Sequence, residues 1–358
     1  MSLEKDTMVY TGSRDHCLDF LRGLAAISII FIHTAYHSGD WYVPENVRTI
    51  ALLLDVPFFM FLTGWSTYYS CNLQRLIRTF FHSWLLWFVI ISSMDVIFVI
   101  SGLWGGKTWG IEWIKQLLFI DCNLPYMTSF NWSIWYMPVY YVVAFLGTCL
   151  ICIFKDAKWK EKNLLYIIGL GFLAVLYLTV NYEKAEFFLL SRQTWFYLFF
   201  FLLGYIMIQQ SWRYKSFISW AVVEQAILIM WYVAGEVLGL ERRNLQVSKF
   251  PPNTMYMIAS LLTINGAVFI RERMGSMFLN ITKPIRYIGK YSLCYYFSQG
   301  FGGALLFYIA PKLEFGWQIK ICICFIINLV VSLTIGTLFS YLDKALRKLI
   351  KSIRTPGI

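Results

Sequence analysis

Charged residues are scarce in this 358-residue chain, where they make up 14% of the sequence, against roughly 25% in a soluble domain. Hydrophobic residues make up 58% and aromatic residues 19%. This composition excludes an ordinary soluble domain. Apolar runs of about 20 residues recur along the chain instead, and each is long enough to cross a hydrocarbon core of roughly 30 Å. The sequence therefore predicts an all-α integral membrane protein.

Several sequence patterns are also missing. The chain has no phosphate-cradling glycine loop, no fixed-period repeat, no heptad seam and no long soluble segment between the apolar runs. Its eight cysteines show no zinc-type grouping, so we predict no metal site. The basic residues behind the net charge of +11 lie mostly on one predicted side of the membrane, as topology signals do. We therefore predict the lipid bilayer as a partner and no nucleic acid.

We predict ten membrane spans with both termini in the cytoplasm. The predicted cytoplasmic side carries an excess of Lys and Arg of roughly two to one, as the positive-inside rule requires. Residues 1–16 form a cytoplasmic segment, 17–341 one membrane domain and 342–358 a basic cytoplasmic tail. The first span lacks a small-residue cleavage site, so we expect it to be retained. The predicted spans are 17–38, 49–70, 77–101, 131–154, 163–180, 193–209, 216–238, 253–271, 287–310 and 317–341.

The longest loop, residues 102–130, contains Trp109, Trp113 and Leu117 at helical spacing beside Glu112 and Lys115. This pattern indicates a helix lying in the outer interface of the membrane.

Two ionisable residues interrupt the first apolar run. Arg22 and His33 are eleven residues apart, which on a helix places them about 20° from alignment and roughly 16 Å apart along the axis. Asp19 lies three residues before Arg22 on the same face and can neutralise or orient its guanidinium. Alternatively, Arg22 snorkels to the headgroups and His33 is a satisfied polar residue in a helix contact. His37 could join His33 in binding a metal, but no further ligands occur at suitable spacing.

The second span places Asp55 at about the depth of His33. Because we expect the first two spans to be antiparallel neighbours, we predict that Asp55 pairs with His33. The carboxylate would orient the imidazole and stabilise its charged form. The alternative is that Asp55 faces an outer aqueous vestibule.

Arg75 and Arg78 follow the second span at a helical spacing of three, on the predicted cytoplasmic side with Arg22. Three converging guanidinium groups suit a nucleotide-like or pyrophosphate-containing ligand, because guanidinium binds phosphate bidentately. The alternative is that Arg75 and Arg78 act as topology signals and lipid-headgroup contacts.

Three aromatic residues, Trp132, Trp135 and Tyr136, open the fourth span at the predicted outer surface. They can stack on a sugar of an acceptor molecule or anchor the helix in the interface.

These blocks together resemble the acyltransferase 3 family of bacterial membrane proteins. The first span, LDFLRGLAAISIIFIH, resembles the family's opening helix with its arginine, ten residues and histidine. VPFFMFLTG resembles the second helix, and Arg75 and Arg78 its following basic segment. NWSIWYMPVYY resembles the tryptophan-led motif, and YIGKYSLCYYFSQ the penultimate-helix motif around Gly289 and Ser292.

The resemblance implies transfer of an acyl group, usually acetyl, from cytoplasmic acetyl-CoA or another acyl-CoA to a hydroxyl of an extracytoplasmic glycan or other surface molecule. It implies a multi-pass protein of the bacterial cytoplasmic membrane with no permanently bound cofactor. Arg22, Arg75 and Arg78 would then hold the donor's phosphates. His33 would act as the general base, with Asp55 beside it.

The sequence departs from the family pattern at Gln299, where many members carry a histidine, and lacks the glutamate that many members place after the tryptophan. The acceptor is therefore open. A transporter or flippase for a polar or lipid-linked substrate is the main alternative function, since such proteins also carry polar groups in interrupted helices. A membrane scaffold or sensor is a third.

Overall fold

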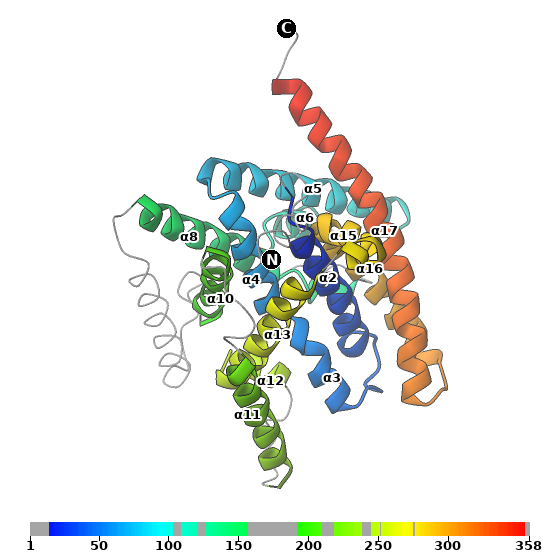
Figure 1. Cartoon of the computed structure of the whole chain (residues 1–358). Helices are drawn as coiled ribbons and strands as arrows, with labels where there is room; N and C mark the ends of the chain where they lie inside the picture. The colour runs from blue at the N-terminus through cyan, green and yellow to red at the C-terminus, as the bar shows by residue number, and fades with distance from the viewer. Residues whose placement is uncertain are drawn as a thin grey trace. The chain divides into compact units, whose positions relative to one another are not determined.

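The computed structural model describes residues 14–102, 109–120, 127–156, 192–209, 218–237, 245–250, 252–274 and 276–354. Within these ranges the architecture is all-helical, apart from isolated bridges such as that between Lys249 and Pro252 (Figure 1). The helices are α2 (His16–Tyr36), α3 (Glu45–Ala51), η1 (Leu52–Leu54), α4 (Val56–Tyr69), α5 (Leu73–Ile100), α6 (Trp109–Leu117), α7 (Thr128–Asn131), α8 (Tyr136–Asp156), α10 (Arg192–Gln209), α11 (Ile218–Val237), α12 (Leu245–Lys249), α13 (Thr254–Arg273), α14 (Ser276–Ile281), α15 (Lys283–Lys290), α16 (Ser292–Ile309), η4 (Ala310–Lys312) and α17 (Trp317–Arg354).

Helices long and apolar enough to cross a membrane occur where several of the predicted spans lie. Within the described residues there are six, and the predicted span 193–209 is a shorter apolar helix. The predicted spans 216–238 and 287–310 correspond to α11 and to α15 with α16. Span 163–180 lies outside the described residues. The all-α multi-span class is confirmed, while the count of ten and the cytoplasmic termini stay predictions. The six stretches are His16–Tyr36, Glu45–Tyr69, Leu73–Ile100, Ser129–Ile153, Thr254–Arg273 and Trp317–Ile350.

The second predicted span is interrupted at Asp55. Its backbone there is extended, with φ −110° and ψ −162°, between η1 and α4. Pro57 explains the new start, because proline lacks a backbone N–H and fits only the first turn of a helix. The amide of Phe58 donates to the carbonyl of Asp55 at 3.0 Å, which closes that first turn.

The chain divides into two compact units. The first comprises Met1–Ser28, Pro44–Leu73 and Val139–Lys290, and the second Ile29–Val43, Gln74–Pro138 and Tyr291–Ile358.

In the first unit, α4 packs along α10 (Figure 1). Gly64 and Gly204 make this contact possible, because a Cβ on Gly64 would meet the carbonyl of Phe201 and one on Gly204 the carbonyl of Phe61. Small residues of this kind let membrane helices approach at backbone distance.

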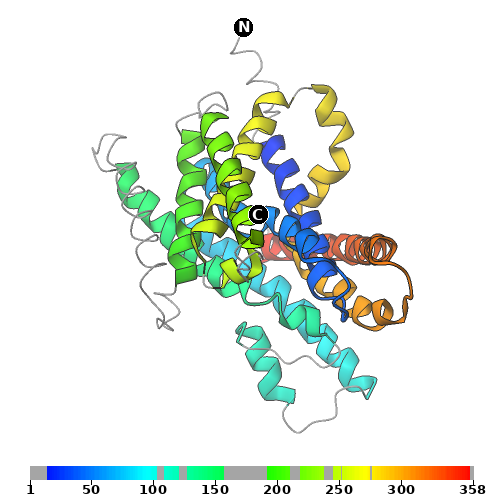
Figure 2. The ribbon, with the colours of Figure 1, turned by 90° about the horizontal axis from the view of Figure 1, so that it is seen from below.

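In the second unit, α16 packs along α17. Ser298 donates from Oγ to the carbonyl of Ser332 at 2.7 Å, and Gly302 lies against Asn328. The helix α17, orange to red in Figures 1 and 2, continues to Arg354. The basic residues after 341 therefore extend the same helix as the tenth predicted span.

The helix predicted within residues 102–130 is confirmed as α6, which packs on α5 through tryptophan hydrogen bonds. Trp113 Nε1 donates to Ser92 Oγ at 3.2 Å, and Trp84 Nε1 donates to the carbonyl of Leu117 at 3.0 Å. An ion pair of 2.8 Å joins Lys115 to Glu112, as their spacing of three permits.

Candidate active site

His33 lies near the end of α2, 7% exposed, in the second unit. Its Nδ1 is 3.4 Å from the hydroxyl oxygen of Ser129, which is fully buried on α7. Ser129 was not predicted as a site residue, because a single serine in an apolar loop carries no spacing signal. The hydroxyl provides the imidazole with an orienting partner inside the helix bundle.

The rings of His33, His37 and Trp132 follow one another in contact, and we call this row the aromatic ladder. The ring of His37, one turn along the chain, lies 4.8 Å from that of His33 and 4.8 Å from that of Trp132. Trp132 is 53% exposed, so the ladder joins a buried imidazole to an exposed indole. The structure thus brings Trp132, predicted to bind the acceptor, to the neighbourhood of His33.

The other two predicted acceptor residues are less exposed. Trp135 and Tyr136 are both half-buried, and the ring of Tyr136 packs 5.2 Å from that of Tyr296 on α16.

Asn328 on α17 holds the backbone of α2 beside His33. Its Nδ2 donates to the carbonyl of Ile30 at 3.2 Å and to Thr34 Oγ1 at 3.0 Å. Asn328 is fully buried, and a buried amide with satisfied donors fixes its neighbours in place. The α2 turn that carries His33 is therefore anchored on α17.

Arg22 lies in the first unit and is half-buried. Both carboxylate oxygens of Asp19 accept hydrogen bonds from Arg14, at 2.5 and 2.8 Å. The predicted role of Asp19 in orienting Arg22 stays a prediction, and the ion pair that the structure gives Asp19 is with Arg14. A Cβ on Gly289 would meet the carbonyl of Asp19, which explains why the chain needs glycine there.

Asp55, 2% exposed, is bound within the first unit. Lys249 Nζ lies 2.7 Å from Asp55 Oδ2, and the hydroxyl of Tyr256 donates to the same oxygen at 2.7 Å. Neither partner was predicted, because both are some 200 residues distant in sequence. The predicted pairing of Asp55 with His33 would join the two units and stays a prediction.

Arg75 and Arg78 are both exposed on α5. They lie in the second unit and Arg22 in the first, so the predicted convergence of the three arginines also stays a prediction. Two exposed guanidinium groups at a spacing of three remain suited to a phosphate.

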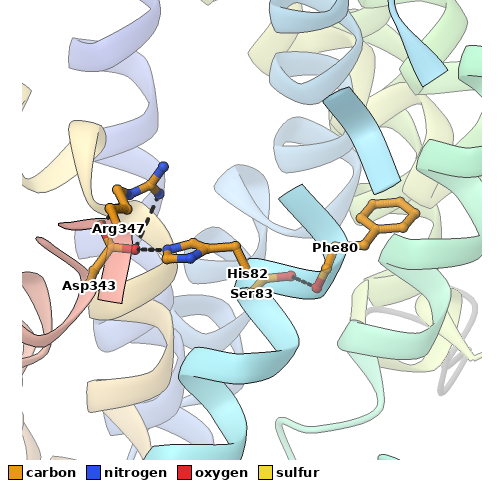
Figure 3. A network of polar contacts seen from close by, with 5 residues as sticks. All are labelled: Phe80, His82, Ser83, Asp343 and Arg347. Atoms are coloured by element: carbon orange, nitrogen blue, oxygen red, sulfur yellow. Dashed lines mark hydrogen bonds and ion pairs between the residues drawn. The ribbon is translucent and has the colours of Figure 1, made fainter. Parts of the chain in front are cut away.

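One helical turn beyond Arg78, His82 forms a polar network with Asp343, which is also buried, and with the exposed Arg347, between α5 and α17 (Figure 3). Its Nε2 lies 2.7 Å from Asp343 Oδ1, and Arg347 Nε lies 2.8 Å from Asp343 Oδ2. The Arg347 side chain is 61% exposed. These contacts hold α5, which carries Arg75 and Arg78, against α17. They were not predicted, because His82 and Asp343 lie far apart in the sequence.

Comparison with known proteins adds one finding. A family model described as an acyltransferase domain, Acyl_transf_3, matches residues 15–337, nearly the whole chain. The chain belongs to the acyltransferase 3 family. No curated protein and no solved structure matched it. Family membership confirms the resemblance carried by the first-span arginine and histidine, and makes the chain a multi-pass membrane protein of an acyltransferase family.

Proposed function

We propose that this protein is an O-acyltransferase, most simply an O-acetyltransferase, of the bacterial cytoplasmic membrane. It takes the acyl group from cytoplasmic acetyl-CoA or another acyl-CoA and transfers it to a hydroxyl of an extracytoplasmic glycan or other surface molecule. The donor is a substrate and no cofactor stays bound. The observation that carries the proposal is the buried His33, placed between the Ser129 hydroxyl and the ladder that leads to Trp132.

His33 acts as the general base. In the tautomer whose Nδ1–H donates a hydrogen bond to Ser129 Oγ, Nε2 is the basic nitrogen. It removes the proton of the acceptor hydroxyl. The acceptor oxygen then attacks the thioester carbonyl carbon. When the tetrahedral intermediate collapses, the carbon–sulfur bond breaks and the imidazolium returns its proton to the thiolate, which leaves as the free thiol.

Trp132 and His37 give the acceptor a place to bind. An exposed indole stacks on the apolar face of a sugar ring, and the neighbouring imidazole carries polar atoms for its hydroxyls. Trp135 and Tyr136 lie on the same segment and support this surface.

Donor binding is assigned to Arg22, Arg75 and Arg78, whose guanidinium groups match the charge and geometry of the coenzyme's phosphates. Arg22→Ala should weaken equilibrium binding of labelled acetyl-CoA, because a charge-assisted contact to phosphate is lost. Equal affinity in Arg22→Ala and wild type would remove this role.

Transfer can be tested in membrane vesicles from cells that produce the protein. With acetyl-labelled acetyl-CoA, release of the free thiol should accompany incorporation of label into surface material, and mass spectrometry of that material should identify the acceptor. A carrier would move its substrate without consuming the donor. Vesicles in which neither thiol release nor label incorporation exceeds that of vesicles lacking the protein would contradict the proposal.

A further inference from the structure

Gln299 on α16 is buried without a hydrogen-bonding partner. It is 1% exposed, and neither its Nε2 nor its Oε1 has a partner among the residues that the structure describes. A buried amide left unpaired loses its hydrogen bonds to water without gaining others, which is unfavourable. A second buried glutamine, Gln116 on α6, also lacks a partner among the described residues, so what distinguishes Gln299 is its position beside the contacts of His33.

The position of Gln299 on α16 follows from its neighbours along the helix. Tyr296 and Gly303, three residues before and four after, lie within roughly 60° of it on the same face. The hydroxyl of Tyr296 donates to the carbonyl of Ser133, and a Cβ on Gly303 would meet Ser129 Oγ. This face of α16 therefore lies against the segment from Ser129 to Ser133, and Gln299 stands between the two contacts.

The same segment carries the partner of His33. Ser129 Oγ is in contact with His33 Nδ1 at 3.4 Å. On the other side of Gln299, Gly302 lies against Asn328, which in turn is bound to Ile30 and Thr34 of α2. The contacts on both sides of Gln299 thus lead to the turn of α2 that holds His33, all within the second unit.

We propose that Gln299 is a catalytic residue whose Nε2–H group donates a hydrogen bond to the acyl carbonyl oxygen during transfer. This inference rests on the proposed function. When the acceptor oxygen attacks, the carbonyl oxygen gains negative charge, and a fixed donor in a buried site stabilises that charge more than it stabilises the neutral thioester. The charge disappears when the carbonyl re-forms and the thiolate leaves.

The test compares Gln299→Leu with Gln116→Leu. Gln116 is an equally buried glutamine of the same unit, fully buried on α6, and its side-chain amide also lacks a partner among the described residues. Leucine keeps the size and removes the unpaired polar atoms, so neither variant should lose thermal stability.

The readout is acetyl transfer from labelled acetyl-CoA in membrane vesicles, with equilibrium binding of acetyl-CoA and the melting temperature measured beside it. Gln299→Leu should lower kcat by about 10²–10³-fold, the loss typical of one oxyanion donor, with acetyl-CoA affinity within about threefold of wild type. Gln116→Leu should keep wild-type kcat. Gln299→Glu should also lose kcat, because it is isosteric but brings a negative charge to the oxyanion.

Three results would overturn the inference: kcat of Gln299→Leu within threefold of wild type, loss of kcat in proportion to loss of folded protein, or an equal loss in Gln116→Leu. His33→Ala is assayed in parallel. If His33→Ala is inactive while Gln299→Leu is fully active, the role of Gln299 fails and the proposed function stands. If the wild-type protein neither releases thiol nor incorporates label, the proposed function itself fails, whereas full turnover in His33→Ala would remove only the role of His33 as the base.

Discussion

Replacing Asp55 by asparagine tests whether this residue stabilises the fold or serves the reaction. Asparagine keeps the shape and an oxygen that can accept from Tyr256, but it removes the negative charge beside Lys249. The Lys249 side chain is 8% exposed and its Nζ lies 2.7 Å from the carboxylate. Two unit charges at that separation attract by about 6 kcal/mol at an effective dielectric constant of about 20. Loss of one partner of a buried pair costs about 3–5 kcal/mol.

Asp55→Asn should therefore reduce stability by about 3–5 kcal/mol, measured as the fraction of protein that stays monodisperse after heating in detergent. Adding Lys249→Met should restore at least half of that loss, because the uncompensated charge disappears. Wild-type stability in Asp55→Asn, or no recovery in the double variant, would refute the structural role of the pair.

The double variant also separates stability from chemistry. If folded Asp55→Asn/Lys249→Met transfers acetyl groups at the wild-type rate, Asp55 serves only the ion pair, and its predicted pairing with His33 is rejected. If folding recovers and transfer does not, the predicted orienting role gains support.

Three further predictions concern a helix contact, a polar network and a cysteine pair. Gly64→Ala should reduce stability by about 1–3 kcal/mol because the new Cβ meets the carbonyl of Phe201. Gly266→Ala, with open space around it, should stabilise α13 by about 0.5–1 kcal/mol, and equal thermal shifts in the two variants would contradict the α4 contact. Asp343→Leu should reduce stability by about 1–3 kcal/mol by leaving His82 without its acceptor. Adding His82→Leu should recover part of that stability. If the stability losses of the two single variants simply add in the double variant, the network is rejected. Cys71 and Cys152, whose sulfur atoms lie 3.3 Å apart, should cross-link under mild oxidation, as mass spectrometry of peptides would reveal; protection of both thiols from cross-linking would contradict their placement.

The sequence predicted the helices well because the membrane imposes a strong apolar pattern. The predicted span 17–38 is α2 from His16 to Tyr36, and 77–101 is α5 from Leu73 to Ile100. The predicted span 49–70 covers α3, η1 and α4, and Pro57, a residue that breaks helices, accounts for the interruption at Asp55 within it. The basic tail after residue 341 was expected as a separate segment, and the structure continues α17 through it.

The polar contacts were harder to predict than the helices. Hydropathy identifies a buried carboxylate such as Asp55, but it gives no information on which distant residue faces it. Lys249 lies in a short helix between two predicted spans, and nothing in its local sequence indicates burial. The same holds for Ser129 beside His33. Sequence periodicity aligned Arg22 with His33 on one helix, whereas partners on other helices depend on how those helices pack.

The role of His33 as the base of acyl transfer can be tested by measuring single-turnover transfer from bound labelled acetyl-CoA in His33→Gln. His16→Gln, a histidine replacement at the other end of the same helix, is the matched control. We expect His33→Gln to bind acetyl-CoA as wild type does and to release no thiol above background, whereas His16→Gln should turn over normally. Wild-type thiol release and label transfer in folded His33→Gln would show that His33 is not the base.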